Sequence, residues 1–154
     1  MTKPTIKPTT NDDVPALQGV LDQTELFPSE MLPDMLAPAL AGETEAFWLT
    51  CHFDGGAVGL CYTVPEELAD GTWNMLALAI RPDLQGKRLG TALLAAAEQH
   101  LQGKGQRVLI VDTSGTDDFA QTRKFYAQNG YDEEARIRDF WAAGDDKVIF
   151  RKAL

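Results

Sequence analysis

The sequence is poor in cysteine, with only Cys51 and Cys61 among its 154 residues. Both lie in stretches predicted to be neighbouring strands, and no secretory segment precedes them, so we expect reduced thiols rather than a disulfide. The two histidines, His52 and His100, stand far apart, and together with two cysteines they give no metal-ligand spacing. No metal site is therefore predicted.

Positive charge and long apolar runs are also scarce. The chain has 14 Lys and Arg against 23 Asp and Glu, a formal net charge of −9. This balance argues against nucleic acid as a partner, because such proteins gather Lys and Arg around phosphates. No run approaches the roughly 20 apolar residues of a membrane helix, and residues 1–8 lack the apolar core of a signal peptide. We expect a cytoplasmic protein without a membrane partner.

The overall composition is typical of a globular domain, with 44% hydrophobic and 24% charged residues. A chain of this length buries about 70% of the surface that its unfolded form exposes, which is enough for a core without disulfides. We therefore predict one domain over residues 1–154.

Periodicity predicts the elements of the first half. A short edge strand surrounds Ile6, and a helix with Val14, Leu17 and Leu21 at helical spacing follows an N-cap at Thr10. Two prolines interrupt the apolar pattern of residues 29–40, which predicts a short or kinked helix there. Alternating residues at 47–53 and 58–64 flank a glycine-rich turn, as a β-hairpin requires.

The second half contains a predicted parallel β-α-β unit. It consists of a buried strand at 72–80, an amphipathic helix at 86–102 and a buried strand at 106–112. A helix capped by Asp118 and ended by Gly130 follows, and then strands at 131–141 and 147–152. The fold class is thus α/β (α+β), a three-layer α/β/α arrangement around a mixed, mostly antiparallel sheet of about seven strands.

The segment Gln85-Gly86-Lys87-Arg88-Leu89-Gly90 carries the clearest chemical signal. It follows a buried strand and opens a helix, whose first N–H groups are unpaired and attract an anion. Gly86 and Gly90 would leave the approach clear, and Lys87 and Arg88 add positive charge. The segment lacks the endings of a P-loop or of a dinucleotide-binding loop.

This segment resembles the acyl-CoA signature of the GNAT superfamily of N-acetyltransferases, Gln/Arg-x-x-Gly-x-Gly/Ala. Gln85 and Gly90 match its first and last positions, while Arg88 stands where the pattern has its middle glycine. Residues 122–131, with Phe125-Tyr126 followed by Gly130 and an aromatic residue, resemble a later motif of the same superfamily. The predicted order of elements is similar to the GNAT fold over essentially all 154 residues.

The resemblance implies acetyl-CoA as co-substrate, with no metal, and assigns residues to it. Tyr126 would be the general acid that protonates the departing thiolate, although packing against the adenine-side arm of the cofactor is an alternative role. The superfamily's cofactor-contacting Asn is missing, because Phe119 occupies its place, and Thr113, Ser114 or Thr116 could replace it. The implied cofactor-binding residues are Leu78, Ala79, Ile80, Gln85, Gly86, Lys87, Arg88, Leu89, Gly90, Thr91 and Thr113.

The implied reaction is transfer of an acetyl group to a primary amine of a small molecule or peptide by direct attack. Many relatives have a Glu base on the strand before the signature, where this chain has Trp73 and Asn74. Alternative bases are a water chain or one of the nearby carboxylates (Glu66, Glu67, Asp70 and Asp112). Asp139 and Trp141 are candidates for substrate contact.

Alternative functions are a non-catalytic acyl-CoA-binding sensor and a transferase for a longer acyl group. A covalent route through a cysteine thiol is a minor alternative. The sequence leaves the acceptor and the oligomeric state open, with a homodimer as one alternative.

Overall fold

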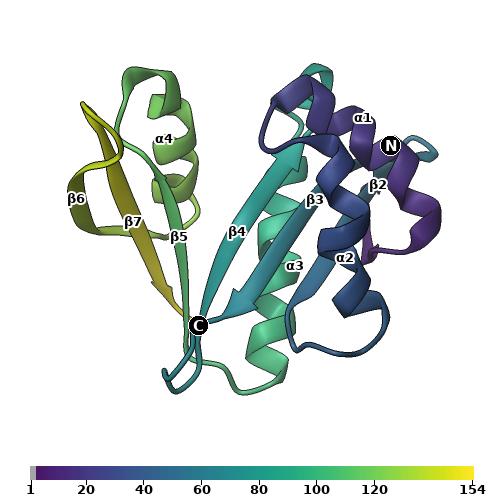
Figure 1. The fold of residues 1–154 in the computed structure, drawn as a ribbon, viewed down its shortest axis with the longest axis horizontal. Coiled ribbons are helices and arrows are strands. Elements are labelled where there is room, and N and C mark those ends of the chain that lie inside the picture. The colour runs from purple at the N-terminus through teal and green to yellow at the C-terminus, as the bar shows by residue number, and fades with distance from the viewer. Residues whose placement is uncertain (1–2) are drawn as a thin grey trace.

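A computed structural model describes residues 3–154, and these form a seven-stranded sheet flanked by helices (Figure 1). The strand order across the sheet is β1-β2-β3-β4-β5-β7-β6. The strands are β1 (Thr5–Pro8), β2 (Phe47–Phe53), β3 (Gly56–Pro65), β4 (Thr72–Ile80), β5 (Val108–Ser114), β6 (Asp132–Ala142) and β7 (Asp145–Ala153). The helices are α1 (Val14–Thr24), α2 (Leu32–Leu40), α3 (Leu89–Gly103) and α4 (Ala120–Gln128).

The strand pairings confirm the predicted mixed sheet. β4 and β5 run parallel with α3 as their crossover, and every other pair is antiparallel. The insertion of β7 between β5 and β6 is a finding that the sequence pattern did not predict.

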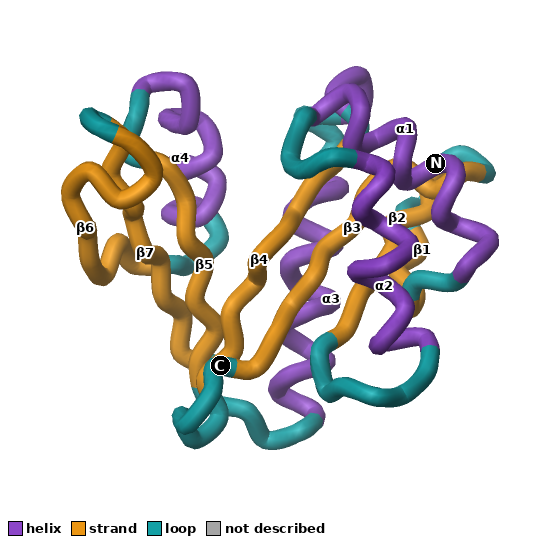
Figure 2. Tube along the Cα trace, in the orientation of Figure 1, coloured by secondary structure: helices purple, strands orange, loops and turns teal. Residues whose placement is uncertain are grey.

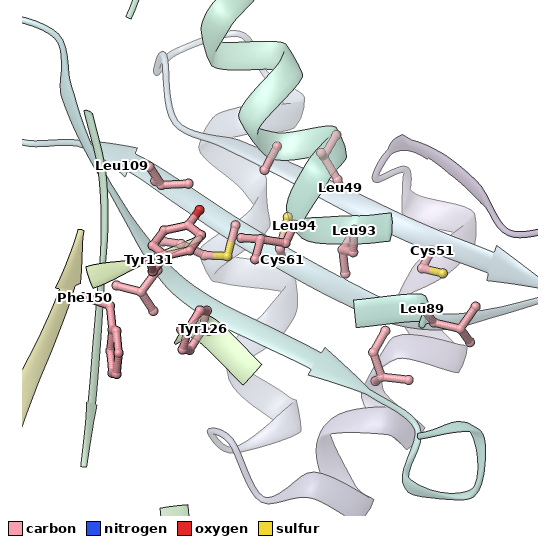
Figure 3. Close-up of a cluster of buried hydrophobic side chains, with 14 of the residues drawn as sticks. Leu49, Cys51, Cys61, Leu89, Leu93, Leu94, Leu109, Tyr126, Tyr131 and Phe150 are labelled. Atoms are coloured by element: carbon pink, nitrogen blue, oxygen red, sulfur yellow. The ribbon is translucent and has the colours of Figure 1, made fainter. Parts of the chain in front are cut away.

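Helices cover both faces of the sheet, as the predicted three-layer class requires. α1 and α2 lie on one face and α3 on the other (Figure 1). Leu17, Leu21 and Leu36 from α1 and α2 pack with Trp48 and Leu60 in one apolar cluster. A larger cluster on the α3 face also takes in Tyr126 of α4 and Phe150 of β7 (Figure 3).

Several predicted element boundaries are wrong by one to three residues. α3 begins at Leu89 instead of Gly86, because Gly86 (φ 86°) and Arg88 (φ 62°) have left-handed backbone conformations that no helix can contain. The predicted Asp118 cap lies inside a short 3₁₀ turn, Asp117–Phe119, and α4 starts only at Ala120. β5 extends to Ser114 instead of ending at Asp112.

The parallel strands β4 and β5 stay together over only four residues each. Thr72–Met75 pair with Val108–Val111, and beyond these residues the two strands diverge (Figures 1 and 2). The outer half of β4 therefore has one edge without a neighbouring strand. An edge of this kind offers main-chain N–H and C=O groups to a ligand.

Candidate active site

A cavity of about 420 Å³ lies where β4 has lost its parallel neighbour. The turn before α3 bounds it on one side and α4 on the other. Its lining residues are Leu78, Ile80, Leu84, Gln85, Gly86, Arg88, Leu89, Gly90, Thr91, Gln121, Thr122, Phe125, Tyr126 and Gln128. The cavity thus joins the first turn of a helix to a buried phenol.

The turn before α3 presents unsatisfied backbone donors to this cavity. Within residues 3–154, no side chain caps the start of α3. The N–H groups of its first turn have no intrahelical acceptor and carry the positive end of the helix dipole. Arg88, which lines the cavity, adds a positively charged side chain to this end of it. The site is therefore suited to a diphosphate.

Gly90 allows α3 and α4 to approach each other at the cavity. A Cβ atom at this position would lie 3.3 Å from the Phe125 Cζ atom, closer than ordinary van der Waals contact. Any larger side chain would have to displace Phe125, which itself lines the cavity. The final glycine of the motif therefore has a steric role here.

The free edge of β4 supplies main-chain donors along the cavity. The Arg81 N–H donates to the Val58 carbonyl of β3 at 2.8 Å. Because successive N–H groups of a strand point to opposite edges, those of Leu78 and Ile80 point away from β3. They face the edge of β4 that is no longer paired with β5.

Tyr126 stands at the inner end of the cavity and is only 4% exposed. Its ring packs edge-on against Phe125, with the centroids 5.2 Å apart. It packs edge-on against Tyr131 as well, with the centroids 5.7 Å apart (Figure 3). Burial raises the pKa of the Tyr126 phenol above its ordinary value of 10.0, and the neighbouring Cys61 adds to the rise. The phenol therefore keeps its proton at neutral pH and can donate it.

Three of the predicted cofactor residues do not line the cavity: Ala79, Lys87 and Thr113. Thr113 is buried, and its carbonyl accepts a hydrogen bond from Trp141 Nε1 at 3.2 Å. The other predicted substitutes for the missing Asn contact each other, with the Ser114 and Thr116 hydroxyls 3.0 Å apart. The remaining predicted cofactor residues are brought together with Tyr126 at the cavity.

Apart from Tyr126, the prediction missed the residues of α4 that line the cavity. Gln121, Phe125 and Gln128 follow at spacings of four and three, which place them on one face of a helix. That spacing was visible in the sequence. The sequence does not show that this face of α4 lies opposite the turn before α3.

Of the predicted substrate contacts, Asp139 lies in β6, in the stretch of irregular register before the β6–β7 turn. Its carboxylate accepts from the Gly144 N–H at 2.8 Å, and its own N–H donates to Asp146 at 3.0 Å. Trp141 is 49% exposed and remains available to a ligand.

No helix within residues 3–154 has the length and apolar character needed to cross a membrane. In the same part of the chain, no three His, Cys, Asp or Glu side chains gather closely enough to hold a metal ion.

Comparison with known proteins gives a consistent family. Residues 43–133 match the family model of the acetyltransferase (GNAT) domain, which is more than half of the chain. No curated protein sequence matches the chain.

Solved structures resemble the chain over nearly its whole length. A protein of Desulfovibrio desulfuricans assigned to the GNAT acetyltransferases is 26% identical and has a TM-score of 0.87; the match covers 98% of this chain and 99% of that one. The ribosomal-protein-S18-alanine N-acetyltransferase of Escherichia coli is 18% identical, with a TM-score of 0.78 and coverage of 98% and 94%. The PaiA N-acetyltransferase of Thermoplasma acidophilum, in complex with coenzyme A, is 17% identical, with a TM-score of 0.77 and coverage of 99% of each chain.

Proposed function

This chain belongs to the GNAT family of acetyltransferases, and from that premise we propose that it transfers the acetyl group of acetyl-CoA to a primary amine by direct attack. The observation that carries the proposal is the single cavity between the uncapped start of α3 and the buried Tyr126. In acetyl-CoA the pantetheine arm separates the diphosphate from the thioester, so one elongated site must serve both.

The residues around the cavity fit the cofactor. We assign the diphosphate to the first-turn N–H groups of α3 and to Arg88, and the pantetheine arm to the free edge of β4. The main-chain N–H of Ile80 or a neighbour would polarise the thioester carbonyl, which requires no side chain. Lys87 lies in the turn but does not line the cavity, so we assign it at most a long-range attraction for phosphate.

Tyr126 is the proposed general acid. Its buried, protonated phenol would donate to the departing sulfur, and help of this kind is typically worth about 10²–10⁴ in rate. Because burial raises its pKa, the phenol stays in the acid form throughout the neutral range. The fit of its ring among Phe125 and Tyr131 holds it in one orientation.

A covalent route through a cysteine is disfavoured by the state of the thiols. Cys51 and Cys61 are both free and buried, as predicted. Burial raises the pKa of Cys51 to about 11 and that of Cys61 to about 12. Thiolate, the nucleophilic form, is therefore rare near neutral pH.

The acceptor is proposed only by class, as an amine of a small molecule or peptide. One structural neighbour is named for an alanine of a ribosomal protein, so the fold accommodates peptide amines elsewhere. The net charge of −9 favours a cationic acceptor over an anionic one. We further propose one domain over residues 1–154 and a cytoplasmic location, and we keep a homodimer as an alternative.

Thiol release from acetyl-CoA in the presence of amines, polyamines, amino acids and aminoglycosides tests the proposal. At least one class should give amine-dependent release that falls in Tyr126→Phe while coenzyme A binding persists. A sensor without catalytic activity would instead bind coenzyme A and release no thiol with any amine. Comparison of acyl-CoA chain lengths separates acetyl transfer from transfer of a longer group.

A further inference from the structure

A second group of polar side chains lies at the point where β4 and β5 part. Trp73 and Met75 both point into the core beneath α3, so Asn74 between them points to the opposite face of the sheet. Asp112 follows the buried Val111 and points to the same opposite face. Because the β4–β5 pairing ends at Met75 and Val111, these polar residues stand at the vertex of the gap.

The group is held together by direct contacts. The Asn74 Nδ2 atom donates to Glu66 Oε1 at 3.0 Å and to Asp112 Oδ2 at 3.3 Å. Lys147 Nζ lies 3.3 Å from the same Asp112 oxygen. Strands β4, β5 and β7 and the loop after β3 each contribute one member.

Two oxygen atoms of this group are buried without a donor. Asn74 is only 6% exposed, and neither its Oδ1 atom nor Asp112 Oδ1 has a hydrogen-bond partner within residues 3–154. A buried acceptor without a donor has lost its hydrogen bonds to water without replacement, so a ligand that supplies a donor is favoured. Two carboxylates against one lysine also leave the group with a negative charge, so a cation that carries several N–H donors suits it.

We propose that Asn74 and Asp112 hold the reacting ammonium group of the acceptor, and that Asp112 takes its proton. The inference rests on the acetyl transfer proposed above. The cofactor cavity includes Tyr126 from the α3 face, whereas the polar group lies on the opposite face. The amine and the thioester would therefore meet through the gap between β4 and β5 from opposite sides.

The proton balance of the reaction assigns one role to each residue. Asp112 accepts one proton from the ammonium, which frees the nitrogen lone pair to form the N–C bond. Tyr126 donates its proton to the sulfur as the C–S bond breaks and its electron pair passes to sulfur. The second nitrogen proton restores the Tyr126 phenol, and Asp112 releases its proton to water.

Lys147 and Glu66 act as positioning residues in this arrangement. Lys147 Nζ lies 4.4 Å from the centre of the Phe140 ring, so the aromatic ring and Asp112 together fix its ammonium. Phe140 and Trp141 are 48% and 49% exposed beside it. They offer an apolar wall to the carbon skeleton of an acceptor.

A binding experiment without coenzyme A tests the site directly. In ¹⁵N-labelled protein, the Asn74 side-chain amide signals should shift on addition of n-butylamine hydrochloride near neutral pH. Tetramethylammonium carries the same charge without an N–H donor, and n-butanol has a similar chain without charge, so both should leave these signals in place. Equal shifts with tetramethylammonium would overturn the proposal, because the donors would then be irrelevant.

Matched variants add a second readout. Asp112→Asn should weaken binding of n-butylammonium at least about tenfold, because it replaces a charged hydrogen-bond acceptor of the ammonium by a neutral one. It should also lower kcat/KM for the best amine of the panel by about 10²-fold or more and leave the KM for acetyl-CoA unchanged. Asp54→Asn, the same exchange at an exposed position in the turn between β2 and β3, is the matched control and should change neither quantity. Unchanged binding and kcat/KM in a folded Asp112→Asn would refute the assignment.

The outcomes separate this inference from the proposed function. Butylammonium binding without thiol release from any amine would retain the ammonium site and reject the transferase. Amine-dependent release that survives Asp112→Asn would retain the transferase and reject Asp112.

Discussion

The Tyr131 hydroxyl donates a 2.6 Å hydrogen bond to Glu98, which connects the segment that follows α4 to the middle of α3. Lys152 of β7 completes the link, because its ammonium lies 3.0 Å from Glu98 Oε1 and 3.0 Å from the Asn129 carbonyl at the end of α4. Tyr131 also packs edge-on against Tyr126. The network therefore fixes the helix that carries the proposed acid relative to the helix that carries the proposed diphosphate site.

Tyr131→Phe should lower the free energy of unfolding by about 1–3 kcal/mol, because it leaves one oxygen of the buried Glu98 without its donor. Urea unfolding measures the change. Tyr62→Phe is the control, since Tyr62 stacks on Trp48 and its hydroxyl donates no hydrogen bond within the described residues. Equal losses in both variants would show that the Tyr131–Glu98 bond contributes nothing specific.

Arg88→Gly should weaken coenzyme A binding about tenfold, because it removes a guanidinium from the proposed diphosphate site. The free energy of unfolding should change by less than about 1 kcal/mol. Glycine relieves the left-handed backbone at φ 62°, while its greater freedom in the unfolded chain acts in the opposite direction. Calorimetry measures the affinity for coenzyme A, and urea unfolding measures the free energy of unfolding.

Lys87→Ala is the comparison variant for Arg88→Gly, because Lys87 belongs to the same turn but does not line the cavity. It should weaken coenzyme A binding less than Arg88→Gly. The reverse order would place the phosphates on the other side of the turn.

Tyr126→Phe should lower kcat by about 10²–10⁴ with little change in coenzyme A binding. In the wild-type protein, the folded pKa of Tyr126 is raised, so its acid form persists at higher pH than a free phenol would. The loss of kcat through ionisation of Tyr126 should begin only above pH 10.0, the ordinary pKa of a tyrosine. The buried neutral phenol also stabilises the fold, and this contribution is fully present below pH 10.0. It is lost as pH rises through the raised pKa of Tyr126 in the folded protein. A kcat profile that falls near neutral pH in wild type but not in Tyr126→Phe would contradict this role.

The double variant Cys51→Ser, Cys61→Ser should keep amine-dependent thiol release if it folds, because direct attack needs no thiol. The native protein should also resist iodoacetamide near neutral pH, since burial raises both thiol pKa values to about 11 and 12. Mass spectrometry of the treated native and unfolded protein checks the second point. Rapid native labelling at Cys61 together with loss of activity would revive the covalent route.

The predictable part of this protein is local in sequence. The alternation of 47–53 and 58–64, and the apolar stretches of 72–80 and 106–112, gave the correct strand pairs because each depends on nearby residues. The predicted start of α3 is three residues too early, because the identity of Arg88 does not indicate a left-handed backbone. The meeting of Asn74, Glu66 and Asp112 was beyond prediction, since it depends on the register of two strands and on the bulge after Tyr62.

The most direct test of the account compares two ligands by isothermal titration calorimetry. Coenzyme A should bind at least about 100-fold more tightly than pantetheine, which has the same thiol arm but no diphosphate, because several charge-assisted hydrogen bonds at the start of α3 are lost. Equal affinities for the two ligands, or no heat with coenzyme A, would contradict the diphosphate site.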